Sequence, residues 1–274
     1  MHYNVVLLPL DEKSIREHLI SFGLNDIRTV DVFSSISSTN DYLLDNELAN
    51  KNIAICVAEQ QTQGRGRYGH QWLSPAAVNL YLSMSWPLRT WKEEYEPLSL
   101  WLLIAIAELL EMQGYSDVQL KWPNDICVEN KKLAGILIER KVNQTNDALV
   151  IGVGLNVAMS LYDDVEIETS WIDLLSIKPD GQLSRNELAA NVVSALYATL
   201  SMLEENRLID LSSKWNRYDM LLNKQVEFIY KEKIETGYVM GIDRLGKLIL
   251  DVNSKLEHLH SSNISEIKLI GNRL

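Results

Sequence analysis

Cysteine is scarce in this 274-residue chain, which has only two. Cys56 and Cys127 show neither the paired spacing of a metal site nor a disulfide framework, so both kinds of structure are excluded. Each lies in an apolar stretch that we predict to be a strand, where a free thiol behaves as a small buried hydrophobe. Unpaired thiols are typical of a reducing compartment, so a cytoplasmic location is expected.

Positive charge is also in short supply. Lysine and arginine total 26 against 37 acidic residues, which gives a net charge of −11. A protein that binds nucleic acid by general electrostatic attraction needs a basic surface. We therefore expect no DNA binding unless a local basic patch provides it.

Long hydrophobic runs are missing. The most apolar run, residues 98–110, is interrupted by Ser99 and Glu108 and is shorter than the roughly 20 residues that span a bilayer. The first residues, MHYNVVLLPLDEK, carry no basic cluster ahead of their apolar stretch, unlike a secretory signal. No membrane association is expected.

A glycine-rich stretch, GRGRYGHQW at 64–72, literally matches the G-x-G-x-x-G pattern of dinucleotide-binding turns. That pattern needs a helix directly after it, because the pyrophosphate binds to the helix N-terminus. Here the next regular stretch, residues 78–85, alternates apolar and polar residues like a half-buried strand, so the match is accidental. What remains is a glycine loop with two cations, Arg65 and Arg67, ending in Trp72, which suggests a clamp for an anionic nucleotide.

The remaining patterns predict an α+β fold, with a mixed β-sheet flanked by helices in residues 1–222 and a small β-barrel in 223–274. Helix starts are indicated by Asp11, by Ser38 or Thr39, and by a capping box of Ser184 with Glu187. The expected helices cover about 11–22, 39–48, 97–114, 185–204 and 208–221. The expected strands cover about 53–58, 78–85, 118–122, 126–129, 133–141 and 148–157, with a turn at Asn130 and Lys131.

Three further stretches combine polar side chains or glycines with strands. KWPND at 121–125 is either a functional strand exit or only a turn, since proline, asparagine and aspartate all favour turns. In KKLAGIL at 131–137, Gly135 marks either the close approach of a ligand or another backbone, or a bulge. In GVGLNV at 152–157, Asn156 could read an adenine edge or merely end the strand.

In order and spacing, SSTN, QTQGRGRYGHQW, KWPND, KKLAGIL and GVGLNV resemble the biotin protein ligases, or biotin-[acetyl-CoA-carboxylase] ligases. The resemblance runs from about Ser34 into the last fifty residues. It implies a mixed sheet related to the class II aminoacyl-tRNA synthetases and lipoate ligases, plus a small Src-homology-3-like barrel. It also implies that biotin and ATP form biotinyl-5′-AMP, and that a lysine of a biotin carboxyl carrier protein, an acetyl-CoA carboxylase subunit, then accepts the biotin.

The resemblance also implies a role for each matching residue. Catalytic cations around the biotin carboxylate and the α-phosphate would be Arg65, Arg67 and Lys132. The biotin site would comprise these positions: Ser38, Thr39, Asn40, Gln61, Gly64, Arg65, Lys132 and Gly135. The adenylate site would comprise Arg67, Trp72, Asn124, Asn156 and Trp171. Asp125 is the carboxylate expected to hold Mg²⁺.

Two departures from the family pattern are visible. Tyr68 and His70 stand where many relatives have arginines, which lowers the fixed charge of the loop and bears on adenylate retention. Only 37 residues precede Ser38, too few for the winged helix-turn-helix of bifunctional relatives, so a monofunctional ligase without DNA binding is expected.

Two alternatives remain. One is a lipoate or octanoate ligase on the same scaffold, disfavoured because those relatives lack this GRGR clamp. The other is a biotin-responsive DNA-binding repressor, disfavoured by the acidic balance and the short segment before Ser38. A homodimer is left open by the sequence.

Overall fold

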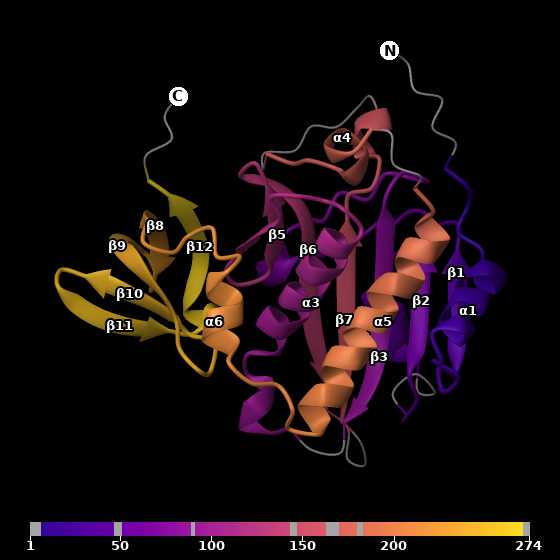
Figure 1. The fold of residues 1–274 in the computed structure, drawn as a ribbon, viewed down its shortest axis with the longest axis horizontal. Helices are drawn as coiled ribbons and strands as arrows, with labels where there is room; N and C mark the ends of the chain where they lie inside the picture. Colours follow the sequence, from indigo (N-terminus) through magenta and orange to yellow (C-terminus); the bar gives the residue numbers. More distant parts are fainter. Residues whose placement is uncertain are drawn as a thin grey trace.

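Two β-sheets organise the protein in a computed structural model, which describes residues 7–46, 51–88, 91–142, 147–162, 170–179 and 183–270. Figure 1 shows the larger sheet in the centre and the smaller one, coloured yellow, beside it. The larger has seven strands in the order β1-β2-β3-β7-β6-β5-β4, and the smaller has five. The α+β class expected from the sequence is confirmed.

The seven-stranded sheet is mixed, because β1 and β2 are parallel while the other neighbours are antiparallel. Its strands are β1 (Thr29–Phe33), β2 (Ala54–Ala58), β3 (Leu80–Leu88), β4 (Gln119–Lys121), β5 (Asp125–Val128), β6 (Lys131–Lys141) and β7 (Asp147–Leu155). The glycine loop contains a 3-10 turn at Arg67–Gly69, and the described residues between the loop and β3 form no helix, which confirms that the loop is not a dinucleotide-binding turn.

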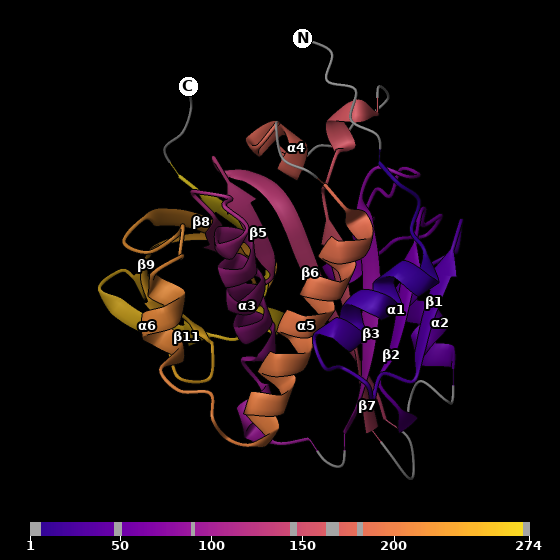
Figure 2. The ribbon, with the colours of Figure 1, turned by 45° about the vertical axis from the view of Figure 1, so that its right-hand side comes forward.

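Helices cover the two faces of this sheet unequally. The helices α1 (Glu12–Ser21), α3 (Leu98–Met112) and α5 (Arg185–Glu204) lie together on one face, as Figure 2 shows, and α2 (Thr39–Asp45) packs on the other. The alternation along β2 agrees: Ile55 and Val57 join the main core, whereas Ala54 and Cys56 join a small cluster with Leu43 of α2. Of these four helices, only α2 packs on that face of the sheet.

Local signals placed the helix ends well. The carboxylate of Asp11 accepts a hydrogen bond from the Ser14 N–H, at 2.8 Å, and begins α1. Of the two candidates for α2, Ser38 is the N-cap. Ser184 begins α5 by accepting from the Glu187 N–H, and Gly114, with φ of +84°, follows α3. These helix starts are confirmed, and the positive φ of Gly114 ends α3 within the range expected for that helix.

Three expected details of the larger sheet's surroundings are wrong. The strand at 78–85 is not half-buried, because β3 lies in the middle of the sheet and is buried on both faces. The β5–β6 turn is made by Glu129 and Asn130, which both have positive φ, and Lys131 already belongs to β6. The helix after Ser38 ends at Asp45 rather than near 48.

The helix expected at 208–221 is much shorter. The helix α6 covers only Leu211–Asn216, because the residues after it pair with β4 instead of continuing the helix. The Leu120 N–H donates to the Tyr218 carbonyl at 2.8 Å, and the Met220 N–H donates to the Leu120 carbonyl at 3.0 Å. A short helix, α4 (Leu174–Ile177), was not expected.

The five-stranded sheet comprises β8 (Gln225–Tyr230), β9 (Lys233–Ile242), β10 (Leu248–Val252), β11 (Lys255–Leu259) and β12 (Ile264–Leu269). Its order is β11-β10-β9-β8-β12, with antiparallel neighbours. The β9–β10 turn rests on the first sheet, because the indole Nε1 of Trp122 donates to the Gly246 carbonyl at 3.0 Å. The division into residues 1–222 and 223–274 stays a prediction.

In the described ranges, no helix combines the length and the apolar character that crossing a bilayer requires.

Candidate active site

A cavity of about 800 Å³ collects nearly all the residues singled out from the sequence. It also touches β12 of the second sheet, through residues 264–268. The expected site residues that line it are Ser38, Thr39, Asn40, Gln61, Arg65, Arg67, Trp72, Asn124, Asp125, Lys132, Gly135, Asn156 and Trp171. Gly64 is not among them: a Cβ there would lie 2.6 Å from the Trp72 carbonyl oxygen, so Gly64 lets the loop fold back on itself.

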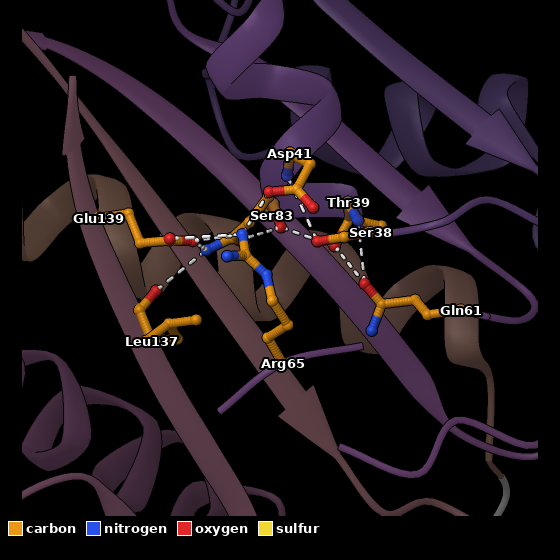
Figure 3. Close-up of polar contacts among 9 residues, drawn as sticks. Ser38, Thr39, Asp41, Gln61, Arg65, Ser83, Leu137 and Glu139 are labelled. Atoms are coloured by element: carbon orange, nitrogen blue, oxygen red, sulfur yellow. Dashed lines mark hydrogen bonds and ion pairs between the residues drawn. The ribbon is translucent and has the colours of Figure 1, made fainter. Parts of the chain in front are cut away.

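One end of the cavity is built from neutral polar groups at the start of α2. The side-chain oxygen of Gln61 accepts from the Thr39 N–H at 2.9 Å and from the Thr39 hydroxyl at 3.1 Å, as Figure 3 shows. Ser38, Thr39 and Gln61 thus come together across 22 residues of sequence. Hydroxyls and amides without net charge suit a neutral ligand with both donors and acceptors, such as a cyclic urea.

Asn40 is seated across three neighbouring strands of the sheet. Its Oδ1 is 2.6 Å from the Ser83 hydroxyl of β3, and its Nδ2 donates to Glu139 of β6 at 2.8 Å. Between them, on β7, a Cβ on Gly152 would lie only 2.4 Å from the Asn40 Oδ1. Asn40 thus occupies the space that a side chain at position 152 would need.

The Trp72 ring packs against β7 in the same way, at Gly154, two residues after Gly152. A Cβ on Gly154 would lie 2.5 Å from the Trp72 ring, and one on Gly135 would lie 3.3 Å from it. The protein atoms that approach these glycines therefore belong to side chains rather than to another backbone, and the ligand approach expected at Gly135 stays a prediction. The alternative reading of a bulge also holds nearby, since β6 shifts register by one residue at Leu133.

The three expected cations lie in different surroundings. Arg65 forms ion pairs with Asp41 and, at 3.3 Å, with Glu139. Lys132 lies 2.7 Å from the Asp125 carboxylate, with its ammonium 5.1 Å from the centre of the Trp72 ring.

Arg67 makes its contacts with the second sheet. It donates to the Ser261 carbonyl at 2.7 Å and to the Tyr68 hydroxyl at 3.2 Å, while Tyr68 donates to the carbonyls of Ser261 and Ile264. Burial lowers the pKa of the Arg67 guanidinium, and the nearby Tyr68 and Asp125 oppose that shift. The loop is thus attached through Arg65 to α2 and β6, and through Arg67 and Tyr68 to the start of β12 and the turn before it.

Asn124 and Asn156 use their amide groups to shape the cavity wall. The Asn124 Nδ2 donates to the Ile136 carbonyl at 3.1 Å, and the Asn156 Nδ2 donates to the Ile172 carbonyl at 3.1 Å. The Trp171 segment runs beside β6, since the Lys132 N–H donates to Ser170 and the Ile172 N–H donates to Lys132. The adenine contacts expected of these residues stay a prediction.

Several residues of the site were missed in the sequence. Ser83 is fully buried beside Thr39 and Asn40, and its only signal was a polar position inside an apolar strand. Glu139 sits at the far end of a strand that otherwise faces the cavity with Gly135 and Leu137. Trp122 belongs to the KWPND stretch; it lines the cavity, is buried, and donates through its indole Nε1 to the Gly246 carbonyl of the β9–β10 turn.

Proteins of known function resemble this chain in sequence. Residues 32–156 match the Biotin/lipoate A/B protein ligase family. The chain is 38% identical to the "Bifunctional ligase/repressor BirA" of Escherichia coli over 245 residues, which is 89% of this chain and 75% of that protein. It is 30% identical to the "Biotin--[acetyl-CoA-carboxylase] ligase" of Mycobacterium tuberculosis over 268 residues, or 95% of this chain and 97% of that one.

A solved structure agrees with the sequence relatives. The biotin protein ligase from Aquifex aeolicus in complex with biotin and ATP superposes with a TM-score of 0.74, at 25% identity, covering 89% of this chain and 100% of the other. The matched stretches include the glycine loop, the α2 segment and the strands that carry Lys132 and Gly154. The chain belongs to the Biotin/lipoate A/B protein ligase family and is, within it, a biotin protein ligase.

Proposed function

We propose that the cavity binds biotin and ATP and forms biotinyl-5′-AMP, releasing pyrophosphate. The observation that carries this proposal is the gradient along the cavity: a neutral polar end at Thr39 and Gln61 leads to an end with Arg67 and Lys132. A biotin whose ureido ring occupies the neutral end would direct its carboxylate towards the cations. The Aquifex relative, crystallised with biotin and ATP, supports this choice of ligands.

Charge neutralisation is the main chemical task of these residues. A carboxylate that attacks the α-phosphate brings two anions together, and cations at that point stabilise the charge that develops at phosphorus. Arg67 is well suited, because it donates to a carbonyl and a hydroxyl and, unlike Arg65, forms no ion pair that would neutralise its charge among the described residues. Lys132 would exchange its Asp125 partner for the reacting oxygens. No protein nucleophile is needed, so positioning supplies the rest.

The contacts of Arg65 support a different role from the one expected of it. Two carboxylates, Asp41 and Glu139, already balance its charge. Such an arginine holds the loop over the cavity better than it neutralises a substrate. We propose that Arg65 mainly closes the loop.

Asp125 fits a Mg²⁺ ion of the kind that accompanies ATP. No group of three or more His, Cys, Asp or Glu side chains that could hold a metal occurs in the described part of the chain. Mg²⁺ needs no such group, since it is commonly held by one or two carboxylates together with substrate phosphates. When bound, the ion would draw off negative charge from the phosphate oxygens. Asp125 lines the cavity and would be its carboxylate.

The second step we propose is transfer of biotin to a lysine of a biotin carboxyl carrier protein. The Mycobacterium relative, named for acetyl-CoA carboxylase, supports that class of acceptor. The amine attacks the mixed anhydride, so an amide bond forms and AMP leaves. We further propose a cytoplasmic ligase that does not bind DNA, supported by the two unpaired thiols and the net charge of −11.

Mass spectrometry of a carrier domain tests the proposal. We expect its acceptor lysine to gain the mass of a biotinyl group after incubation with the protein, biotin and ATP. Lipoate or octanoate supplied in place of biotin should leave the carrier unmodified. Modification by lipoate but not by biotin would instead support the lipoate ligase alternative.

A further inference from the structure

Glu139 lies just beyond the cavity rather than in it. Residues two apart on a strand point to the same face, and on β6 that face presents Gly135 and Leu137 to the cavity. Glu139 is next along the same face, with a side chain 25% exposed. It can therefore act on the reaction only through residues that it holds.

Its carboxylate joins two parts of the site that are far apart in sequence. One oxygen accepts from the Asn40 Nδ2 at 2.8 Å, and the other is 3.3 Å from the Arg65 guanidinium, as Figure 3 shows for Arg65. Asn40 belongs to the α2 wall of the expected biotin pocket, and Arg65 belongs to the glycine loop. A single side chain thus connects the wall to the loop.

The connection on the Asn40 side is stiff. Asn40 is only 5% exposed, and its Oδ1 is fixed by the Ser83 hydroxyl at 2.6 Å. The space left by Gly152 admits the amide in this position. A buried amide that turned away would leave polar groups without partners, which is costly. Any change in the position of Asn40 is therefore passed to Glu139.

We propose that Glu139 is a positioning residue that couples occupation of the biotin pocket to closure of the glycine loop. The inference rests on the proposed function, because it assumes that biotin lies against the α2 wall. A ligand that fixes Asn40 also fixes Glu139, and Glu139 then holds Arg65 in the closed position. By linkage, a closed loop strengthens biotin binding by the same factor.

Limited trypsin digestion measures how often the loop opens. Trypsin must bind the Arg65 side chain in its own specificity pocket before it can cut after that residue. The cutting rate after Arg65 is measured with and without biotin, in the absence of ATP, for wild type, Glu139→Gln and Glu139→Ala. Glu111→Gln is the matched control, because it alters a carboxylate paired with an arginine, Arg217, on a different surface.

Biotin should slow cutting of the wild type and of Glu111→Gln at least about threefold. Glu139→Ala should lose that protection and bind biotin about fivefold more weakly, the size of one net hydrogen bond of about 1 kcal/mol, with the ATP KM within about twofold. Glu139→Gln keeps an acceptor for Asn40 but no charge for Arg65. Its biotin Kd should stay within about threefold, while the protection by biotin falls by about half or more.

Undiminished protection in both variants would overturn the coupling. If Glu139→Ala fails to fold in a thermal melt, the conservative Glu139→Gln decides alone, and full protection there refutes the proposal. A wild type that binds no biotin in calorimetry would refute the proposed function instead, so the two failures are distinct.

Discussion

Replacing Gly152 with alanine should weaken biotin binding far more than ATP binding. Gly152 lies in β7 with ordinary strand backbone, so alanine is permitted there by conformation. The added Cβ would, however, lie 2.4 Å from the Asn40 Oδ1, well inside van der Waals contact. The substitution therefore perturbs the seat of Asn40 and leaves the strand intact.

The magnitude follows from the contacts that Asn40 would lose. Moving the amide away breaks its bonds with Ser83, at 2.6 Å, and with Glu139, at 2.8 Å. At about 1 kcal/mol net for each bond, the loss is about 2 kcal/mol, or roughly 30-fold in affinity. Ser83→Ala, which removes one of the two bonds, should cost about half as much.

Gly154→Ala is the matched comparison on the same strand. There the added Cβ would lie 2.5 Å from the Trp72 ring. Crowding of this kind costs about 1–3 kcal/mol, and because Trp72 is expected beside the adenine, the ATP KM should rise most. The two variants thus distinguish the end of the cavity expected to bind biotin from the end expected to bind ATP.

Biotin-dependent exchange of pyrophosphate into ATP measures both KM values, with one substrate varied while the other saturates. Thermal melts confirm that each variant is folded. If Gly152→Ala raised the biotin KM less than about threefold, or raised the ATP KM more, the assignment of the Asn40 end to biotin would be wrong.

Four further outcomes are expected. Lys132→Ala should slow biotin-dependent pyrophosphate release by about 2 to 4 kcal/mol of barrier, and an unchanged rate would remove Lys132 from the mechanism. Arg67→Gly should form biotinyl-AMP more slowly, because a cation proposed to neutralise the reacting anions is lost, and an unchanged rate of synthesis would contradict that role. The biotinyl-AMP that does form should escape faster, because the link to Ser261 is lost, and should label bystanders such as serum albumin. Burial raises the pKa of Cys127 from an ordinary 9.0 to about 12, so its contribution to stability is present below pH 9 and is lost as the pH rises towards 12. The denaturant midpoint should fall over that window, and less steeply in Cys127→Ala. Finally, the protein loaded with biotinyl-AMP should not shift operator DNA at physiological salt; a sequence-selective shift at nanomolar protein would overturn that expectation.

The sequence predicted those features that depend on neighbouring residues. Caps at Asp11, Ser38 and Ser184 decide helix starts within one turn, and they were found. The helix at 208–221 failed because helical periodicity competes with pairing to β4, and Leu120 lies about a hundred residues away. Local patterns carry no information about such a partner.

The candidate site shows the same division. The motifs brought Gln61, Lys132 and Trp72 to one cavity, because each stretch has its own recognisable chemistry. The partners of Arg65 could not be predicted, since Glu139 is 74 residues away and ends a strand of unremarkable composition. The glycines were noticed, but what fills the space beside them depends on side chains from α2 and the loop.

The hydrogen bond from Trp122 to Gly246 joins the smaller sheet to the wall of the cavity. Trp122 stands three residues before Asp125 on the chain and is only 1% exposed. A chain shortened before Gln225 would uncover that indole and would also remove β12 from the cavity wall. A shortened version of this protein that still encloses the cavity should therefore keep both sheets.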